Sequence, residues 1–555
     1  MADRRDLLKL GVLSSSLSML SKRGILRLIP ASWWDDPHSP ATRPFLAPLP
    51  VPPAALAEFS ASGRRYELVA EVAHLRVHPD MPGDTELWRF RDLRVPGDQV
   101  FSALGPTVVM RMNEPVTVAH HNALPANHRG FGRPELTIHH HGGHMPMIFD
   151  GFPDAEAIPG FNPVFRSGRS YEYHYPMRDV GFSYHEEDRT ERPATQWYHD
   201  HLIHSTGPNV YRGLAGLAAI FDELDTGDET GRMFPETNLR LPSGDLFDVG
   251  LALTDKLFAP DGSLVYRPEN FDGFLGDKSL VNGAIQPFHE VQRRKYRFRI
   301  LNACNARVTG VALTEARGTR VPFDRIGNDG GLFARTLRAQ ERMVLAPAER
   351  ADIVVDFSGF PDGTRLYLEN QLPQQDGRGP GGTLENPDFT SAGIRMLEFR
   401  VKGSQPVSDP SRVPDVLRPF APISAAEIAR AKRTSFVFER TNGAWAINGR
   451  FDDLTRPVAT FAQNTPQIWS LENKGGGWWH PLHVHLEFFR VLSRNGRVPP
   501  AHERDGMARK DMILLGPNDK AEIFFKFRDF PGRWVFHCHN LEHEDHFMMG
   551  AFDVV

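Results

Sequence analysis

Cysteine is scarce in this chain of 555 residues, which contains only Cys304 and Cys538. A cysteine that binds a metal ion cannot also form a disulfide, so a metal-binding Cys538 leaves the chain without a disulfide. Cys304, which ends the run Leu301-Asn302-Ala303-Cys304, is expected to be a small buried residue.

The chain also lacks an excess of basic over acidic residues. The chain has 64 Lys and Arg against 69 Asp and Glu, a formal charge of −5, and no Lys/Arg-rich run. Nucleic acid is therefore not expected as a partner. The hydrophobic content of 40% is high enough for the cores of about three or four globular domains.

Long hydrophobic runs are missing as well. The apolar stretch that follows Arg4-Arg5 extends only to Leu20 and is interrupted by serines, so no stable membrane span is expected. The pair resembles a twin-arginine export signal, which implies the twin-arginine translocation machinery and a periplasmic, cell-surface or secreted location. A disordered basic tail is the alternative. The small-x-small pattern at Ala55-Leu56-Ala57 lies far downstream, so the cleavage site stays open.

Histidine, by contrast, is concentrated in a few short segments. The 24 histidines of the chain would form roughly one His-x-His pair by chance. Alternate residues of a strand point to the same face, so each such pair offers two imidazoles on one face. Eight imidazoles can hold three copper ions and leave coordination room for dioxygen. Four pairs occur, at His139 and His141, His199 and His201, His483 and His485, and His537 and His539.

Cys538 is the most informative residue because it lies between His537 and His539. On a strand its side chain points to the face opposite its two neighbours. Its thiolate can hold one copper while the two histidines hold other ions, which leaves a very short covalent path for electrons. The pattern therefore predicts redox chemistry.

The remaining ligands of a blue-copper site also follow from strand alternation. His480 does not share a face with His483 and can join Cys538, although Pro481 can distort the strand locally. His543 and Met548 follow Cys538 closely, and two imidazoles, a thiolate and a weak axial Met form the blue-copper pattern. A structural zinc site is the alternative, but zinc has no use for a cysteine flanked by two other ligands.

Short alternating runs separated by Gly, Pro, Asn and Asp predict an all-β fold from about residue 100 onward. One strand pattern occurs three times, at 116–122, 296–302 and 468–473, and a second occurs at 351–357 and 521–527. The third repeat continues into Cys538, whereas the second continues into Leu368-Glu369-Asn370, which cannot bind copper. Three consecutive β-sandwiches with a spacer in the middle are therefore predicted.

The predicted boundaries follow from these repeats and from Pro-rich segments. They are a signal and leader at 1–59, a first domain with metal ligands at 60–235, a spacer domain at 236–402, a linker at 403–432 and a last domain at 433–555.

Taken together, these motifs resemble those of three-domain multicopper oxidases over about residues 60–555. The chain is most similar to the spore-coat laccases, bilirubin oxidases and phenoxazinone synthases, through the motifs at 139–143, 150–153, 197–201 and 537–545. The resemblance implies cupredoxin-like Greek-key sandwiches and four copper ions per chain. It assigns the type 1 copper to His480, Cys538, His543 and Met548, the type 2 copper to His139 and His483, one type 3 copper to His141, His199 and His539, and the other to His201, His485 and His537.

Asp150 and Glu544 match positions that this family uses near its copper cluster. Reduction of dioxygen in a dry site consumes protons, so acidic groups close to the cluster are needed. The alternatives are that Asp150 caps a turn and that Glu544 pairs with a surface arginine. Trp478 could adjust the type 1 site or simply pack on its strand.

The resemblance implies an exported, laccase-like oxidase that takes single electrons from a small-molecule or metal-ion donor and reduces dioxygen to water. His480 and Cys538 are expected to serve as electron entry point and electron path. Phenols, aminophenols or bilirubin-like pigments are the expected donors. A metallo-oxidase for Cu(I), Fe(II) or Mn(II) is one alternative, although the 15 methionines are dispersed. A copper-free cell-division scaffold is the other, although no ligand is missing.

Overall fold

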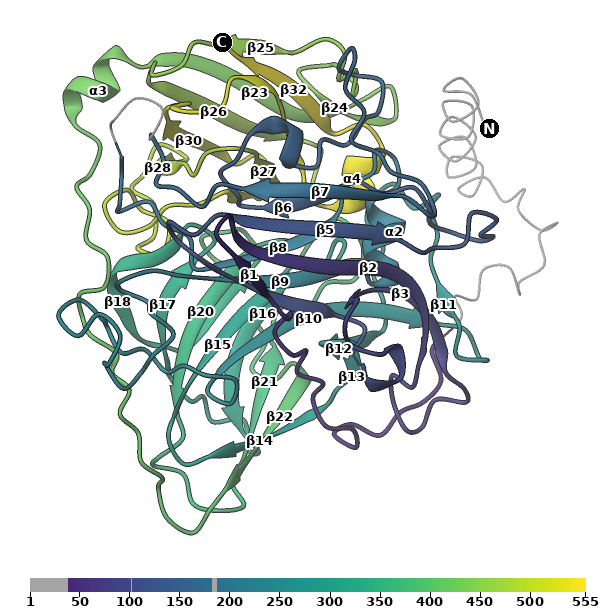
Figure 1. Cartoon of the computed structure of the whole chain (residues 1–555), viewed down its shortest axis with the longest axis vertical. Helices are drawn as coiled ribbons and strands as arrows, with labels where there is room; N and C mark the ends of the chain where they lie inside the picture. The colour runs from purple at the N-terminus through teal and green to yellow at the C-terminus, as the bar shows by residue number, and fades with distance from the viewer. Residues whose placement is uncertain (1–37, 101, 182–186) are drawn as a thin grey trace.

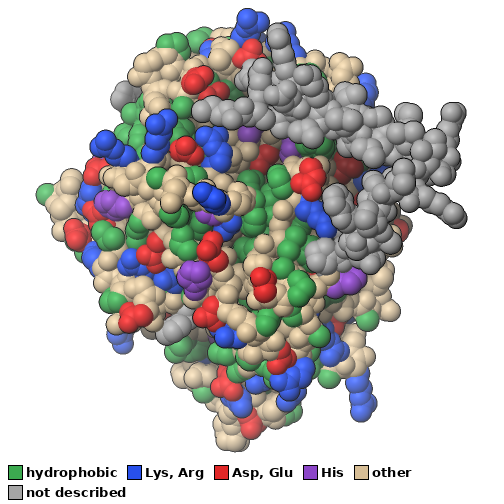
Figure 2. Space-filling view, turned by 90° about the vertical axis from the view of Figure 1, so that its right-hand side faces the viewer, with side chains coloured by type: hydrophobic (Ala, Val, Ile, Leu, Met, Phe, Trp, Pro, Cys, Tyr) green, Lys and Arg blue, Asp and Glu red, His purple; other side chains and the backbone are tan. Residues whose placement is uncertain are grey.

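The computed structural model describes residues 38–100, 102–181 and 187–555, and within them strands far outnumber helices, which confirms the all-β prediction. Strands of the described residues form six main sheets, arranged as three pairs along the chain (Figure 1). No helix in these ranges is long and apolar enough to cross a membrane. Figure 2 shows Lys and Arg intermixed with Asp and Glu on one face of the molecule.

The first sandwich joins a five-stranded and a four-stranded sheet around a core that includes Trp88, Leu136 and Tyr173. The first sheet has the order β1 (Glu58–Ser60), β2 (Gly63–Leu75), β5 (Val116–Asn122) and β7 (Ser170–Tyr175), with β3 (Thr85–Asp92) on β2. The second has the order β4 (Gly105–Arg111), β9 (Ala215–Phe221), β8 (Thr195–Asp200) and β6 (Ile138–His141). The short helices of this first sandwich are η2 (Gly97–Gln99), η3 (Met147–Phe149) and α2 (Thr206–Arg212).

The second sandwich has a core that includes Leu251, Phe298 and Phe399. Its larger sheet has the order β13 (Ala284–Ile285), β12 (Lys278–Val281), β10 (Asp248–Phe258), β15 (Lys295–Asn302), β20 (Arg350–Asp356), β17 (Phe323–Asn328) and β18 (Gly331–Gln340), with β11 (Leu264–Val265) on β10. Its smaller sheet has the order β14 (Phe288–Gln292), β22 (Ile394–Lys402), β21 (Arg365–Asn370), β16 (Thr309–Glu315) and β19 (Arg342–Leu345).

The third sandwich has a core that includes Trp469, Phe536 and Cys538. One sheet has the order β24 (Ala444–Ile447), β23 (Lys432–Thr441), β26 (Gln467–Lys474), β30 (Lys520–Phe525) and β28 (Arg490–Arg494). The other has the order β25 (Ala459–Phe461), β32 (Met549–Val554), β31 (Gly532–Cys538), β27 (His480–Val484) and β29 (Met512–Leu515). The helices are α3 (Ala425–Arg430) and α4 (Leu541–Asp545).

The three copies of the repeated strand pattern occupy the same place in three sheets. Each of β5, β15 and β26 pairs in parallel with a preceding strand and antiparallel with a following one. The repeat in the sequence is therefore also a repeat of pairing. The predicted domain boundaries themselves stay predictions.

The described part of the predicted leader packs against the sandwiches. The backbone N–H of Leu49 donates to the carbonyl of Phe288 at 2.6 Å, and the Leu49 side chain belongs to the second core. Ala55 belongs to the first core. Residues 38–57 therefore contribute to the fold, while Arg4-Arg5 lies outside the described residues.

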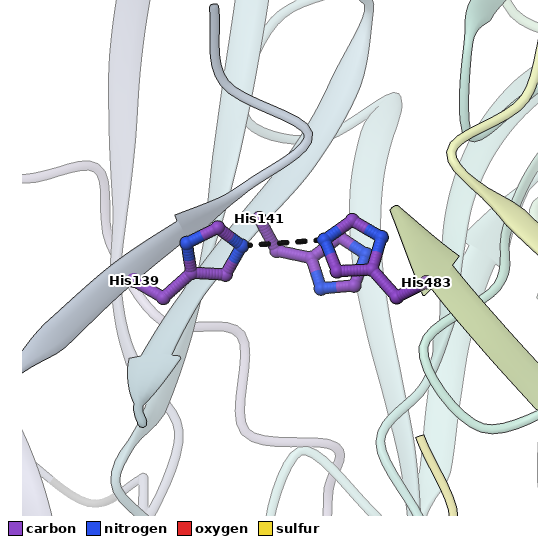
Figure 3. A group of neighbouring side chains, drawn as sticks. All are labelled: His139, His141 and His483. Carbon is purple, nitrogen blue, oxygen red and sulfur yellow. Dashed lines mark hydrogen bonds between the residues drawn. The ribbon is translucent and has the colours of Figure 1, made fainter. Parts of the chain in front are cut away.

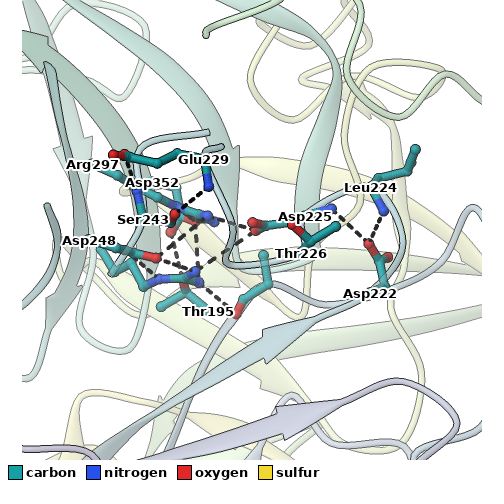
Figure 4. A network of polar contacts seen from close by, with 12 residues as sticks. Thr195, Asp222, Leu224, Asp225, Thr226, Glu229, Ser243, Asp248, Arg297 and Asp352 are labelled. Atoms are coloured by element: carbon teal, nitrogen blue, oxygen red, sulfur yellow. Dashed lines mark hydrogen bonds and ion pairs between the residues drawn. The ribbon is translucent and has the colours of Figure 1, made fainter. Parts of the chain in front are cut away.

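A buried ionic network lies where the first two sandwiches meet (Figure 4). Arg297 of β15 is fully buried and forms ion pairs with Asp352 and, at 2.7 Å, with Asp225. The Thr195 hydroxyl donates to Asp352 at 2.6 Å. A buried charge is tolerated only when it is paired and hydrogen-bonded. Because Thr195 begins β8, the network fixes the start of a histidine-bearing strand on the second sandwich.

Candidate metal centre

Two strand pairs from different sandwiches supply the histidines. In the first sandwich β6 pairs with β8, which sets His139 opposite His199. In the third sandwich β27 pairs with β31, which sets His483 opposite His537. All eight histidines of the His-x-His pairs are at most 1% exposed. The centre is therefore formed between domains whose ligands are far apart in the sequence.

Ligand atoms of these side chains converge in small groups. Among the described residues, atoms that lie within 4.8 Å of one another define five groups that could hold a metal ion. Three of these groups match the predicted sets. The other two both contain His139: one joins it to His141 and His483, and the other joins it to Asp150 and His485. The matching groups are His141, His199 and His539; His201, His485 and His537; and His480, Cys538 and His543.

His139 and His483 face each other across the boundary between the sandwiches (Figure 3). Their Nε2 atoms are 3.4 Å apart. The His139 Nδ1 faces the carbonyl of Asp150 at 2.6 Å, and the His483 Nδ1 faces the carbonyl of Asp511 at 2.9 Å. A carbonyl only accepts, so both rings carry their proton on Nδ1. Two Nε2 lone pairs therefore point toward each other, an arrangement that a cation between them stabilises.

The Nε2 atoms of His201, His485 and His537 also lie close together. The Nε2 of His485 lies 3.4 Å from that of His201 and 3.3 Å from that of His537. The Nδ1 of His537 donates to the carbonyl of Cys538 at 3.2 Å, which leaves a lone pair on its Nε2. Three buried imidazoles thus present nitrogen atoms to one point.

The group of His141, His199 and His539 contains buried nitrogens that have no hydrogen-bond partner among the described residues. These are the Nε2 of His199 and both ring nitrogens of His141 and His539. The Nδ1 of His199 donates to the carbonyl of Asp200 at 2.8 Å, so its Nε2 is again an acceptor. Unsatisfied buried polar atoms are costly, and a bound metal ion would satisfy them.

Burial also keeps five of these imidazoles neutral. It lowers the pKa of His139, His141, His483, His485 and His539 well below the ordinary value. Neutral imidazole is the form that binds metal ions. The donor set therefore fits several closely spaced ions that prefer nitrogen ligands, such as copper.

Cys538 lies on the opposite side of β31, as alternation predicts. Its Sγ is 3.5 Å from the Nδ1 of His480 and 3.5 Å from the Nδ1 of His543, and these two nitrogens are 3.1 Å apart. The Nε2 of His543 donates to the carbonyl of Asp272 at 3.2 Å, so its Nδ1 lone pair faces the sulfur. Burial raises the pKa of the Cys538 thiol well above its usual value, so a thiolate here needs a bound cation.

Met548 and Met549 point to different cores. Met548 is fully buried in the core that contains Cys538, and its carbonyl accepts from the Cys538 N–H at 3.0 Å. Met549 packs with Phe152 and Ala157 instead. Met548 is therefore the methionine whose side chain shares the environment of the sulfur ligand.

Glu544 and Asp150 are both buried among the histidines. The Glu544 carboxylate is buried and lies 3.1 Å from the Nδ1 of His201 and 3.0 Å from that of His537. Burial opposes its charge, but these two imidazoles hold its pKa well below the ordinary value. The Asp150 Oδ2 lies 2.7 Å from the Nδ1 of His485, and burial raises the Asp150 pKa well above its usual range.

Comparisons with known proteins agree with this geometry. A model of the multicopper oxidase family matches residues 425–555. Bilirubin oxidase of Albifimbria verrucaria is 33% identical over 93% of this chain and 82% of its own length. Laccase of Bacillus subtilis is also 33% identical, over 92% of this chain and 98% of its own length. The chain belongs to the multicopper oxidases. The structure of the McoA multicopper oxidase of Aquifex aeolicus is similar, with a TM-score of 0.73 and 26% identity over 93% of this chain and 99% of that one.

Membership confirms that this multicopper oxidase has cupredoxin-like domains and that it is a laccase-like copper oxidoreductase that uses dioxygen. Copper is thus the metal that the histidine groups are suited to hold.

Several residues around the centre have no signal in the sequence. The carbonyl of Asp511 orients His483, while its carboxylate lies 3.5 Å from the Nε2 of His141 and pairs with Arg350. The Trp445 ring packs 4.0 Å from His543 and 5.3 Å from His480, measured between ring centroids. Neither Asp511 nor Trp445 adjoins a histidine motif in the chain.

Asn540 adjoins a histidine motif and lies just before α4, where asparagine is a helix-capping signal. Its side-chain oxygen accepts a hydrogen bond from the His543 N–H.

Proposed function

We propose that the multicopper oxidase binds four copper ions per chain. The proposal is supported by the convergence of buried, neutral imidazoles whose lone pairs face one another, and by the cysteine placed between two of them. The ligands would be His480, Cys538, His543 and Met548 for type 1; His139 and His483 for type 2; His141, His199 and His539 for one type 3 ion; and His201, His485 and His537 for the other.

Bound copper supplies one-electron transfer from a donor and four-electron reduction of dioxygen to two waters. The chain provides the link between the two regions, because Cys538 is joined through single peptide bonds to His537 and His539. It also excludes bulk water, since these three side chains are at most 1% exposed. The Cys538 position is the observation on which the proposal chiefly rests.

Glu544 and Asp150 would manage protons beside the cluster. Glu544 contacts the Nδ1 atoms of two histidines, so it can accept a hydrogen bond from each and hold both rings in one orientation. Asp150 contacts His485 through its carboxylate and His139 through its carbonyl. Its raised pKa suits a group that keeps a proton until one is needed.

Donors would enter at His543 rather than at His480, the entry point expected from the sequence. Both rings are fully buried, but His543 donates to the carbonyl of Asp272, which lines a cavity of about 510 Å³. The same cavity is lined by Arg378, whose carbonyl accepts from the N–H of Trp479 at 2.7 Å and whose guanidinium lies 5.1 Å from the Trp478 ring. One peptide group thus separates the cavity from the buried imidazole.

The volume of this cavity suits organic molecules, since small-molecule sites span roughly 300–1,000 Å³. Phenols, aminophenols and bilirubin-like pigments are the proposed donors, in line with the laccase and bilirubin oxidase names of the relatives. A donor screen with recorded oxygen uptake tests this, with four electrons consumed per dioxygen as the expected stoichiometry. Uptake with Cu(I), Fe(II) or Mn(II) alone would overturn the proposed donors.

A pocket variant separates binding from electron transfer. Gln375→Trp fills the cavity and should raise the KM for organic donors while the type 1 potential stays unchanged. Gln405→Trp, at an exposed position outside the cavity, is the matched control.

Export through the twin-arginine route is also proposed. It is supported by Arg4-Arg5 ahead of a short apolar stretch, and implies a periplasmic, cell-surface or secreted enzyme.

A further inference from the structure

A small cavity lies between the first and second sandwiches, and its lining contains no histidine and shares no residue with the cavity of about 510 Å³ proposed for donors. The volume of the small cavity is about 40 Å³. The lining comes from both sandwiches and includes Leu104 and Ala215 of the first and Ala252 and Ala303 of the second. About one water-sized probe volume, roughly 10–15 Å³, is the minimum that holds a water, so a diatomic gas fits.

Hydrogen bonding makes this cavity a poor site for water. Three of its polar lining side chains are engaged elsewhere: Lys256 Nζ donates to the carbonyl of Tyr211 at 2.6 Å, Arg212 Nε to that of Phe131 at 2.8 Å, and Asn282 Nδ2 to that of Gly250 at 2.9 Å. The Thr254 hydroxyl is the fourth, and the other lining residues are apolar or glycine, so the cavity offers few of the two to four partners that a buried water uses.

The cavity approaches the surface on one side. Its walls at Ala103, Gly213, Thr254, Leu264 and Gly283 are half-buried, whereas Ala215, Ala252 and Ala303 are at most 5% exposed. A gas molecule can therefore reach it from solvent through small local fluctuations.

On its buried side the cavity joins an apolar strip that ends at the histidines. Four of its lining residues, Leu104, Ala215, Ala252 and Ala303, belong to a cluster that also contains Trp197. The Trp197 ring stacks on His199 with centroids 4.2 Å apart, and lies 5.3 Å from His141 and 5.6 Å from His539. The strip thus leads from the cavity to all three histidines of one predicted copper set.

We propose that this cavity is a binding site for apolar gas and the antechamber through which dioxygen reaches the cluster. Dioxygen lacks strong hydrogen-bonding groups, so it partitions from water into a dry apolar space. The alanines of the strip have no side-chain rotamers and leave the least bulk for a small molecule to pass. The route to the cluster rests on the proposed function, but gas binding in the cavity does not.

Xenon tests the site directly, because it binds dry apolar cavities and needs neither copper nor turnover. Crystals of the full-length protein under xenon pressure should show an anomalous peak in the cavity. Ala252→Val, which fills the space, should remove that peak, and Ala303→Val serves as a second filling variant if the first does not fold. Ala346→Val, at an equally buried alanine outside the lining, should keep the peak.

Kinetics test the route. Ala252→Val should raise the KM for dioxygen severalfold, while the KM for the donor and kcat at saturating dioxygen stay unchanged. Absence of a xenon peak in the unsubstituted protein would overturn the site, and an unchanged KM for dioxygen in a variant that has lost the peak would overturn the route. A xenon peak in a copper-loaded protein that consumed no dioxygen with any donor would instead overturn the proposed function, and the route with it.

Discussion

The Asp545 carboxylate accepts a hydrogen bond of 2.9 Å from the backbone N–H of Thr206, the first residue of α2, and one of 2.8 Å from the next N–H. Asp545 ends α4, the helix of the third sandwich that contains His543. On the same helix, Glu542 accepts from the Tyr266 hydroxyl at 2.9 Å. Two carboxylates therefore tie the helix that holds a type 1 ligand to the first and second sandwiches at once.

Asp545→Ala should destabilise the protein, because it leaves the buried backbone N–H groups of Thr206 and Gly207 without their acceptors. A buried donor without a partner costs about 1–3 kcal/mol, so the melting temperature should fall clearly and copper at the type 1 site should be held less tightly. Asp553→Ala is the control, because its ion pair with Arg533 is partly exposed. Equal melting temperatures for the two variants would contradict the anchoring role.

Cys538→Ser should abolish the blue colour and turnover, because the oxygen of serine cannot replace the thiolate. The other histidine groups are untouched, so metal analysis should find three copper ions rather than four. Cys304→Ser is the natural control: Cys304 is buried with its Sγ 3.7 Å from the carbonyl of Leu253, and should keep both colour and activity. Comparable turnover in Cys538→Ser would show that electrons take another path.

Glu544→Gln should slow turnover without removing the blue colour. The substitution keeps the shape but removes the charge that faces His201 and His537, and loss of such a supporting carboxylate typically costs about 10–100-fold in activity or metal affinity. Measurement of kcat, copper content and the visible spectrum separates these effects. Glu522→Gln, at an outer ion pair with Arg433, should leave all three unchanged. A Glu544→Gln enzyme with full kcat would exclude a role in proton supply.

Replacement of both Arg4 and Arg5 with Lys should leave the protein in the cytoplasm, since the twin-arginine receptor reads that pair. Arg23→Lys combined with Arg27→Lys, which conserves the same charge elsewhere in the leader, is the matched control. Fractionation followed by activity staining measures the outcome. Export of the Arg4 and Arg5 variant at the control level would point to a different route.

Much of the centre could be predicted because its signals are local. Strand alternation alone separates Cys538 from His537, and the repeated pattern marks the three strands β5, β15 and β26. The ligand groups form only where the strand pair β6–β8 meets the strand pair β27–β31. Which histidines share one copper ion could be predicted only through the family resemblance.

What the sequence did not indicate depends on contacts between distant segments. The ring of Trp445 on His543 joins residues almost a hundred positions apart, and Asp545 meets Thr206 across 339 positions. The packing of Leu49 into the second core was hidden because a Pro-rich segment has no strand periodicity. Tertiary contact decides these positions, and no local pattern records it.

Met548→Leu should raise the potential of the type 1 site. A thioether at the axial position donates weakly to copper and favours the oxidised state, whereas leucine has a similar volume and no donor atom, so the packing cost should be small. Dioxygen reduction would lose driving force, while poorly reducing phenols would give up electrons more readily. Redox titration measures the shift. Met549→Leu is the control, because that side chain packs with Phe152 and should leave the potential unchanged. A shift in Met549→Leu together with none in Met548→Leu would exchange the two assignments and place the axial ligand one residue later.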